Sequence, residues 1–521
     1  MAFTTKHYVK KTGATYVYSV ESYWDKEKKQ PRNKQVCLGR LDEKTGEIIP
    51  SGRKKRVAKR AAAATAEGIT ATTKVIGPHL IIDKVASDTG LADTVRKSFG
   101  AEAGDLALSL AYFEAQRGLP LSRSETWSES HEHPFGERIA SQRVSDFLTA
   151  LGDDRQSRFF SLWLDKLSEN ECFCYDITSI SSYSESNAYV RWGHNRDGEK
   201  LPQINLAVLY GQTSGLPAYM RSLPGSISDV STLKTTIKAL DFIGQTKLTF
   251  VLDRGFYSEN NVNELFKSRY HFVVAPITSR VWVRKILDSH YEEIKHPLNH
   301  RKLPQGETLF MKTHLHNWNG RRCYLHIYYN ARRAASDYDG FTASLLDMRE
   351  ELLSGKIDEA KEDLYKRFFI VKDLPKRGRQ VDYNVDAIEK YRNRYAGFFC
   401  LLTTEKMAPE EALTIYRNKD AVENCFDDLK NGLDMNRLRI HSSEAMRAKL
   451  LLQFLALVLI SRIRTVIKSN PKLKNMAVRE VLEAMETVVM VKYSGRYGHL
   501  VTEAGPLQRD ILAAFDIALP A

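Results

Sequence analysis

Between about residue 172 and residue 276 the apolar residues recur with the spacing of β-strands, and this constrains the fold more than any other pattern in the chain. Apolar or alternating runs of strand length occupy 173–178, 203–210, 218–220, 248–253 and 271–275. Helical patterns at about 229–242 and 258–268 separate the later strands. Three strands in a meander, followed by alternation of helix and strand, predict a mixed sheet with helices packed on it.

Outside this stretch the chain has a strand-rich start, a helical region and a long interruption. Residues 14–20 alternate and are rich in β-branched and aromatic side chains, and 35–40 offer a partner strand across a charged turn. From Gly77 to about 170 the apolar spacing is helical. Residues 277–395 are highly charged and interrupt the order of strands, which resumes with the apolar run 396–403. We therefore expect 277–395 to be an insertion into one domain.

The longest apolar run, 450–460, predicts a buried core helix. It is shorter than the ~20 residues that a membrane span needs, and Lys449 and Arg462 flank it. The N-terminus has no charged segment followed by an apolar one, so no signal peptide is expected. The 6 cysteines are scattered without the spacing of a zinc or redox motif, which is typical of small buried residues in a reducing compartment. The expectation is a cytoplasmic protein with no membrane partner.

The first 60 residues carry most of the net charge. They hold 16 Lys/Arg against 6 Asp/Glu, a net of +10, while the whole chain has +13. Aromatic side chains interleave with this charge, which argues against a disordered tail. The block ends in a cluster predicted to contact the phosphates of a polyanion such as DNA: Arg53, Lys54, Lys55 and Arg56.

A helix predicted at about 408–430 offers one carboxylate and three groups that bind phosphate. Tyr416, Lys419, Glu423 and Lys430 are spaced by 3, 4 and 7 positions. At about 100° per residue, an unbroken helix places all four within an arc of roughly 60°, as one ridge roughly 21 Å long. A carboxylate suits a divalent metal, while cations and a phenol suit phosphate. The ridge therefore indicates metal-assisted chemistry on a nucleic-acid backbone.

Two further carboxylates, Asp176 and Asp253, lie at or near the ends of predicted strands. Carboxylates at strand ends of an α/β sheet face the crevice where ligands bind. Together with Glu423 they could hold one or two Mg²⁺ ions, and two metals roughly 3.5–4 Å apart activate an attacking oxygen and stabilise the leaving one. Each carboxylate alone is more often a cap or a surface charge, so this prediction depends on the set.

The third carboxylate has rivals on the same helix. On the helical projection Asp427 lies about 20° and Asp420 about 40° from the start of the ridge, so geometry leaves both open beside Glu423. The alternative for Asp427 and Asp428 is a solvated helix face that pairs with neighbours such as Lys430.

The order of these motifs resembles that of a known enzyme family. Tyr175-Asp176-Ile177-Thr178-Ser179 resembles the first-aspartate motif of bacterial insertion-sequence transposases of the DDE superfamily, and Leu252-Asp253-Arg254-Gly255-Phe256-Tyr257-Ser258 resembles their second. The stretches 193–198, 202–205, 215–217 and 228–229 are similar too. The ridge resembles the Tyr-(2)-Arg-(3)-Glu-(6)-Lys signature of the subgroup with a large insertion before the glutamate. Matched positions run from about 172 to 465, and four ordered motifs are a specific signal.

The resemblance implies a metal-dependent DNA transposase. It assigns three catalytic metal ligands: Asp176, Asp253 and Glu423. It places three side chains on transposon-end DNA: Tyr416, Lys419 and Lys430. The implied cofactor is Mg²⁺, two ions per site, for which Mn²⁺ can substitute. Members of this family cut double-stranded DNA at terminal inverted repeats, expose a 3′-hydroxyl and join it to target DNA, working as a homodimer.

The expected fold class is α/β, multidomain α+β overall, with an RNase H-like mixed sheet flanked by helices and interrupted by a large insertion. The expected regions are a basic β-rich DNA-binding region at 1–60, a helical region at 61–170, the first part of the catalytic core at 171–276, a mixed β/α insertion at 277–395, the second part of the core with the Glu423 helix at 396–470, and a helical C-terminal region at 471–521.

One position departs from the family signature. Lys419 stands where an arginine is expected, which keeps the charge but loses the planar two-point fork. We expect weaker phosphate geometry there without loss of activity. Two other functions stay open: a catalytically silent DNA-binding relative that acts as a repressor or end-binding protein, and a plain RNase H-like nuclease. The silent relative predicts loss of a carboxylate, and this chain keeps all three.

Five other residues are weaker candidates. Arg254 follows Asp253 and could orient phosphate or form a structural ion pair. His194 and Asp197 lie in a turn, where a DNA contact competes with a loop hydrogen bond. Trp282 and Trp318 lie in the insertion and could stack on a flipped base, with a core or surface position as the default.

Deleting residues 1–60 should abolish binding to inverted-repeat DNA while the core stays folded. Phosphate contacts from a basic block supply much of the affinity for DNA, and that affinity falls steeply with salt. A mobility-shift titration of the full and the truncated chain measures the effect, with circular dichroism as the folding control. Unchanged affinity of the truncated chain would contradict the prediction.

Overall fold

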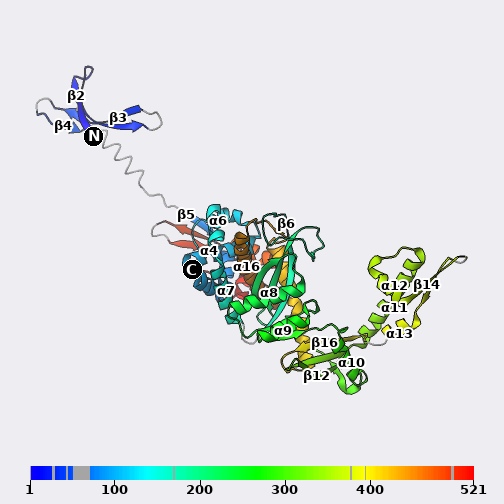
Figure 1. Ribbon diagram of the computed structural model, residues 1–521. Helices are drawn as coiled ribbons and strands as arrows, with labels where there is room; N and C mark the ends of the chain where they lie inside the picture. The colour runs from blue at the N-terminus through cyan, green and yellow to red at the C-terminus, as the bar shows by residue number, and fades with distance from the viewer. Residues whose placement is uncertain are drawn as a thin grey trace. The chain divides into compact units, whose positions relative to one another are not determined.

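The computed structural model describes residues 2–25, 30–42, 45–50, 71–167, 171–304, 306–375, 378–392, 395–494 and 498–520. The chain divides into two compact units, one of Met1–Thr73 with Val491–Leu500 and one of Lys74–Met490 with Val501–Ala521 (Figure 1). The basic cluster of Arg53, Lys54, Lys55 and Arg56 lies outside the described residues, so its contact with DNA stays a prediction.

The first unit contains an antiparallel sheet of four strands in the order β1-β2-β3-β4. These are β1 (Ala2–Val9), β2 (Ala14–Asp25), β3 (Gln30–Leu41) and β4 (Ile48–Pro50). The predicted partner strands pair as expected, since Tyr16 lies opposite Arg40 and Val20 lies opposite Gln35. Phe3, Tyr8, Tyr23 and Trp24 of this unit are exposed, whereas Tyr16 and Tyr18 are half-buried.

The second unit begins with the predicted helical region, which packs around one long C-terminal helix. Its helices are α2 (Gly77–Asp88), α3 (Leu91–Phe99), α4 (Ala101–Arg117), α5 (Ser124–Ser130), α6 (Ser141–Ala150) and α7 (Asp153–Leu167). The helices α2, α4 and α6 contact α16 (Ser443–Ser469). By length and composition α16 could cross a membrane, but 78% of its apolar window is buried inside the protein. It is therefore the buried core helix that the run 450–460 predicts.

A ten-stranded mixed sheet forms the centre of the second unit. Its order is β11-β12-β13-β16-β10-β9-β6-β7-β8, with β17 beside β6. The strands of the predicted core are β6 (Cys172–Ser182), β7 (Gln203–Gly211), β8 (Pro217–Pro224), β9 (Thr249–Leu252) and β10 (His271–Val274). β7 runs antiparallel to β6 and β8, whereas β9 is parallel to both β6 and β10. The mixed sheet is confirmed.

The stretch between β10 and β16 (Phe398–Thr403) adds strands to the same sheet. These strands are β11 (His300–Lys302), β12 (Thr308–Trp318) and β13 (Arg321–Tyr329). β13 pairs with β16 along its length, from Tyr324↔Thr403 to Tyr329↔Phe398. β10 pairs with β16 only through Val273↔Thr403 and Val274↔Leu402. The two halves of the sheet therefore meet at a narrow joint.

The rest of this stretch forms a small body with its own apolar core. It consists of α11 (Ala331–Ser354), α12 (Glu362–Phe368), β14 (Phe369–Leu374), β15 (Gly378–Tyr383) and α13 (Val385–Arg392), while α10 (Val281–Ile294) packs on β12. Leu345, Phe368 and Val381 belong to that core. α11 ends at Ser354, because Gly355 adopts a left-handed φ of 73°.

Helices cover both faces of the sheet. α8 (Asp229–Phe242) and α9 (Glu259–Lys267) contact each other, and α9 packs on β10. α14 (Pro409–Arg417) packs on β9 and β10 and also on β12, β13 and β16, so it crosses the narrow joint. The C-terminal region contains α17 (Val478–Ala484) and α18 (Pro506–Ala514).

The C-terminal region is less helical than predicted. It also holds β18 (Val489–Tyr493) and β19 (His499–Val501), and β5 (Ala71–Val75) is a further short strand. The β-branched residues Val489 and Val491 of β18 explain part of the difference, since such residues favour strands over helices.

A buried carboxyl group lies where α4 packs against α16. Glu114 of α4 is 2% exposed, and its Oε1 has no hydrogen-bond partner among the described residues. Burial raises the pKa of Glu114 to about 7, even though the charge of Lys449 opposes the rise. Because this pKa lies above the ordinary value, folding favours the neutral acid. Its stabilising contribution is present at low pH and is lost as the pH rises through about 7.

Glu114→Gln should therefore gain thermal stability over the parent protein as the pH rises. The difference should grow by up to about 3 kcal/mol between roughly pH 5 and pH 8, because the glutamine cannot ionise. Unfolding midpoints at both pH values measure this. Glu102→Gln, at the exposed start of the same helix, is the matched control and should show no such trend. A pH-independent difference for Glu114→Gln would contradict the prediction.

Candidate active site

The two candidate aspartates are adjacent because β9 is shorter than its parallel neighbour. Tyr175 of β6 pairs with Leu252, the last residue of β9, and β6 continues beyond it to Ser182. Asp176 and Asp253 each follow that last shared pair directly. Asp176 therefore lies inside β6, and the prediction that it lies near a strand end is wrong for its own strand. It is the end of β9 that brings the two side chains together.

Alternation along β6 decides which helices Asp176 faces. The Tyr175 hydroxyl lies 3.3 Å from Thr236 Oγ1 of α8. Successive strand residues point to opposite faces, so Cys174 and Asp176 share the other face. There Cys174 Sγ donates to the Asn418 carbonyl at 3.9 Å. Asp176 thus faces the segment that carries the predicted ridge.

The predicted helix at 408–430 is broken, so the four-residue ridge does not form as one row. The segment consists of α14 (Pro409–Arg417), a 3-10 turn (Asn418–Asp420), α15 (Ala421–Asp427) and a π-helical turn (Asp428–Gly432). Gln212 Nε2 donates to the Ile415 carbonyl at 2.7 Å, the group that accepts from the Lys419 N–H in an unbroken helix. A side chain that enters the hydrogen-bond ladder bends a helix. The sequence pattern gave no sign of Gln212.

Two of the four ridge residues meet at Asp253. The Tyr416 hydroxyl donates to Asp253 Oδ1 at 2.7 Å, and Lys419 Nζ lies 3.9 Å from the same oxygen. Burial raises the pKa of Tyr416, and the bond to Asp253 raises it further, so the phenol remains a donor. Burial lowers the pKa of Lys419, but nearby acids, Asp253 first, outweigh it and raise that pKa overall. Both groups therefore hold the carboxylate in one orientation.

Arg196 contacts both Asp176 and Asp229, although the motifs did not predict it as a site residue. Its Nη1 lies 3.4 Å from Asp176 Oδ1, and its Nη2 lies 2.6 Å from Asp229 Oδ2. Burial raises the pKa of Asp176, while the Ile177 N–H and Arg196 lower it and the charge of Asp253 raises it. The available signal was the position of Arg196 inside the stretch 193–198.

Glu423 is exposed on α15 and does not join the two aspartates. Its charge raises the pKa of Lys419, which places it near that side chain. Among the residues that the structure describes, no three His, Cys, Asp or Glu side chains are arranged to hold a metal ion. Asp176 and Asp253 fit a divalent cation as adjacent oxygen donors. The identity of the third ligand stays a prediction.

The rival acids have different surroundings. Asp420 lies 3.3 Å from Lys419 Nζ, and Asp427 accepts from Asn431 Nδ2 at 2.7 Å on the exposed side of the helix. Asp428 is buried and forms an ion pair with Arg464 of α16. The expectation of a solvated face is therefore wrong for Asp428. Its ion pair connects the π-helical turn to the core helix.

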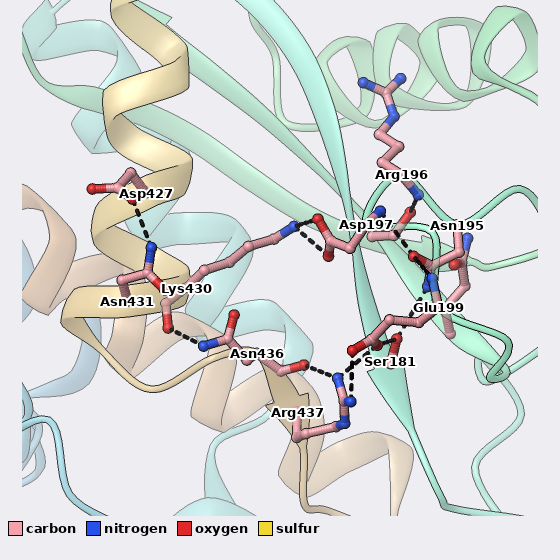
Figure 2. A network of polar contacts seen from close by, with 12 residues as sticks. Ser181, Asn195, Arg196, Asp197, Glu199, Asp427, Lys430, Asn431, Asn436 and Arg437 are labelled. Carbon is pink, nitrogen blue, oxygen red and sulfur yellow. Dashed lines mark hydrogen bonds and ion pairs between the residues drawn. The ribbon is translucent and has the colours of Figure 1, made fainter.

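Lys430 pairs with a different acid, Asp197. Its Nζ is 2.7 and 2.6 Å from the two carboxylate oxygens of Asp197, in the loop between β6 and β7 (Figure 2). Lys430, which was predicted to contact phosphate, is thus paired with a carboxylate of the same chain. Asp197 connects its loop to the π-helical turn.

A cavity of about 990 Å³ begins beside Asp253, at Arg254. Its other cations are Arg284, Lys285 and Arg367, and its aromatic side chains include Tyr338, Tyr391 and Tyr395. Arg284 lies 5.4 Å from the centre of the Tyr395 ring, and Arg367 lies 5.2 Å from that of Tyr391. The cavity that Arg254 lines thus contains cations stacked on aromatic rings.

The two tryptophans of the insertion hold elements together. Trp318 is buried and its Nε1 donates to Asn263 Oδ1 of α9 at 2.8 Å. Trp282 Nε1 donates to the Tyr257 hydroxyl at 3.1 Å, and its ring centre is 5.5 Å from that of Trp318. The default position among packed side chains therefore describes both better than an exposed wedge.

Asp428→Asn should destabilise the helical segment around Glu423. The change leaves the partly buried guanidinium of Arg464 without its counter-charge, at a cost of about 1–3 kcal/mol after allowance for the exposure of Arg464. Asp427→Asn, on the exposed side of the same helix, is the matched control and should cost less than about 0.5 kcal/mol. Thermal unfolding and hydrogen exchange of residues 418–432 measure both. Equal effects of the two changes would contradict the prediction.

Comparison with known proteins places this geometry in a family. A search of curated proteins finds no match. Among solved structures, one described as a cryo-EM structure of piggyBac transposase synaptic complex with hairpin DNA is similar at 9% identity and a TM-score of 0.35, over 78% of this chain and 70% of that chain. A likeness this weak carries no argument. The family model described as transposase DDE domain matches residues 168–459, which is more than half of the chain and contains both aspartates and Glu423. The chain therefore belongs to the DDE-domain transposases.

Proposed function

We propose that this protein is a DNA transposase that cleaves DNA at the ends of a mobile element and joins the freed 3′-hydroxyls to target DNA. The observation that carries the proposal is the adjacency of Asp176 and Asp253, with Tyr416 and Lys419 directed at Asp253. Adjacent carboxylates with a fixed orientation suit divalent cations better than a structural role, because two like charges repel unless a cation compensates them.

We propose that Asp176, Asp253 and Glu423 hold Mg²⁺, with Mn²⁺ able to substitute and two ions per site. A bound metal activates the attacking oxygen and neutralises charge on the phosphate. Tyr416 fixes the rotation of the Asp253 carboxylate through its hydrogen bond. Lys419 supplies positive charge beside Asp253, where the phosphate approaches. Arg196 holds Asp176 from the other side.

The proposed reaction is two phosphoryl transfers. In cleavage, a water oxygen bonds to phosphorus and the water loses a proton, while the bond from phosphorus to the 3′-oxygen breaks and that oxygen takes up a proton to leave as a 3′-hydroxyl. In joining, this hydroxyl bonds to a target phosphorus and loses its proton, while the 3′-oxygen of the target strand leaves and takes one up. Neither transfer needs a redox partner or a second substrate beyond DNA.

Three features support a DNA substrate. Arg254, which follows Asp253, lines the same cavity as Arg284, Lys285 and Arg367, and the tyrosines that line this cavity suit nucleotide bases. The first 60 residues hold most of the net positive charge. The order β8-β7-β6-β9-β10, with β7 alone reversed, supports an RNase H-like core. We further propose that the protein acts as a homodimer in the cytoplasm, on inverted-repeat ends.

Glu423→Gln should bind DNA as the parent protein does but should not cleave it, because the amide removes an anionic metal ligand. The substrate is a labelled duplex that carries either end of the element encoding this chain, incubated with Mg²⁺ or Mn²⁺. Mobility shift measures binding, and denaturing gels measure nicking.

Asp427→Asn and Asp420→Asn are the matched controls on the same segment, and both should keep full cleavage. Full activity of Glu423→Gln with loss in one control would assign the third ligand to that rival acid. Binding without cleavage by the parent protein would favour the silent DNA-binding relative, and cleavage without joining would favour the plain nuclease.

A further inference from the structure

In the loop between β6 and β7, two acids separated by one residue form ion pairs with two cations from the segment that follows α15. Asp197 pairs with Lys430 of the π-helical turn, and Glu199 pairs with Arg437 of β17 (Arg437–Leu438) (Figure 2). Asn195 organises the loop, because its Oδ1 accepts from the backbone N–H groups of both acids at 2.9 and 3.2 Å. The two ion pairs look alike in charge but differ in how firmly each is held.

The Glu199 carboxylate is held by two side chains, Arg437 and Ser181. Arg437 Nη1 and Nη2 each lie 2.6 Å from a different oxygen of Glu199, which is the two-point arrangement of a strong guanidinium pair. The Ser181 hydroxyl donates to the same carboxylate. Arg437 is itself fixed, since β17 pairs with β6 through Arg437↔Ser181. Breaking this pair would disturb the sheet.

Asp197 is held at one point. Its carboxylate contacts Lys430 Nζ, and no other described side chain forms an ion pair or hydrogen bond with it. Its side chain is 45% exposed. The next residue, Gly198, has a left-handed φ of 73°, which gives the loop a turn at this position. The carboxylate can therefore move away without loss of the anchor at Glu199.

Lys430 is the less exposed partner, at 15%. Its ammonium group lies on the turn that directly continues the helix of Glu423. Two carboxylate oxygens at 2.6 and 2.7 Å present the same kind of acceptor to an ammonium group as two oxygens of a phosphodiester. The ion pair thus compensates the charge of Lys430 and holds its ammonium group in one position.

We propose that Asp197 stands in for phosphate: its carboxylate occupies the position at Lys430 that a backbone phosphate of DNA takes, and DNA binding exchanges one for the other. The inference rests on the proposed contact of Lys430 with DNA. Glu199 and Arg437 keep the loop in place during the exchange. The Asp197–Lys430 pair disfavours weakly bound polyanions, because a phosphate must replace the contacts of the carboxylate.

The competing explanation is that the Asp197–Lys430 pair only stabilises the fold. The two explanations predict different changes in DNA affinity when Asp197 is replaced by asparagine. If Asp197 competes with phosphate, Asp197→Asn should tighten binding to DNA by roughly two- to fivefold, the worth of a partly exposed ion pair. If the pair only stabilises the fold, the same change should weaken binding or leave it unchanged.

The experiment measures fluorescence-anisotropy titrations of the full chain with a labelled linear DNA duplex of mixed sequence, over a range of salt concentrations. Lys430→Gln should weaken binding and reduce the slope of log affinity against log salt by about 1. In the Lys430→Gln background, Asp197→Asn should have no effect. Glu199→Gln should lower the unfolding midpoint without tightening binding.

Asp510→Asn is the matched control for the loss of one negative charge, since Asp510 pairs with Lys472 at 2.5 Å on another surface. It should leave the affinity unchanged. Equal tightening by Asp510→Asn, or tightening by Asp197→Asn that persists without Lys430, would overturn the inference and leave the proposed function intact. Unchanged affinity and slope for Lys430→Gln would overturn both the inference and the proposed contact of Lys430 with DNA.

Discussion

Parallel pairing of β6 with β9 is the constraint on which the candidate site depends. The register runs from Cys172↔Thr249 to Tyr175↔Leu252, and each aspartate follows the last pair. A slip of one residue in either strand would turn one of these side chains to the face covered by α8, because side chains alternate along a strand. The close packing of apolar side chains on both faces of β6 and β9 opposes such a slip, because it would move each side chain into a space shaped for another. The packing of the core thus fixes the positions of the Asp176 and Asp253 carboxylates relative to each other.

The sheet and the two aspartates could be predicted because their signals are local. Apolar runs of four to nine residues identify strands wherever they lie in the chain, and a polar residue that interrupts or ends such a run stands out. Asp253 is an example, since it follows Phe250-Val251-Leu252. The helical region before β6 and the buried helix α16 were predictable for the same reason.

The geometry of the ridge could not be predicted, because distant residues decide it. Gln212 interrupts the helix at Ile415 although it lies more than 200 positions upstream. Asp197 takes Lys430, and Arg464 draws Asp428 into the protein. A helical projection contains none of these partners. The projection identified the four ridge residues but not their partners, and it did not predict that Tyr416 and Lys419 contact Asp253.

The narrow joint between β10 and β16 gives α14 a mechanical role. Two residue pairs resist twisting far less than a full ladder does, so the sheet is most compliant at this line. α14 packs on strands of both halves and therefore stiffens the sheet across this line. Its last turn carries Tyr416, whose hydroxyl is fastened to Asp253. A rotation of the outer half of the sheet would therefore move α14 and, through Tyr416, shift the Oδ1 atom of Asp253.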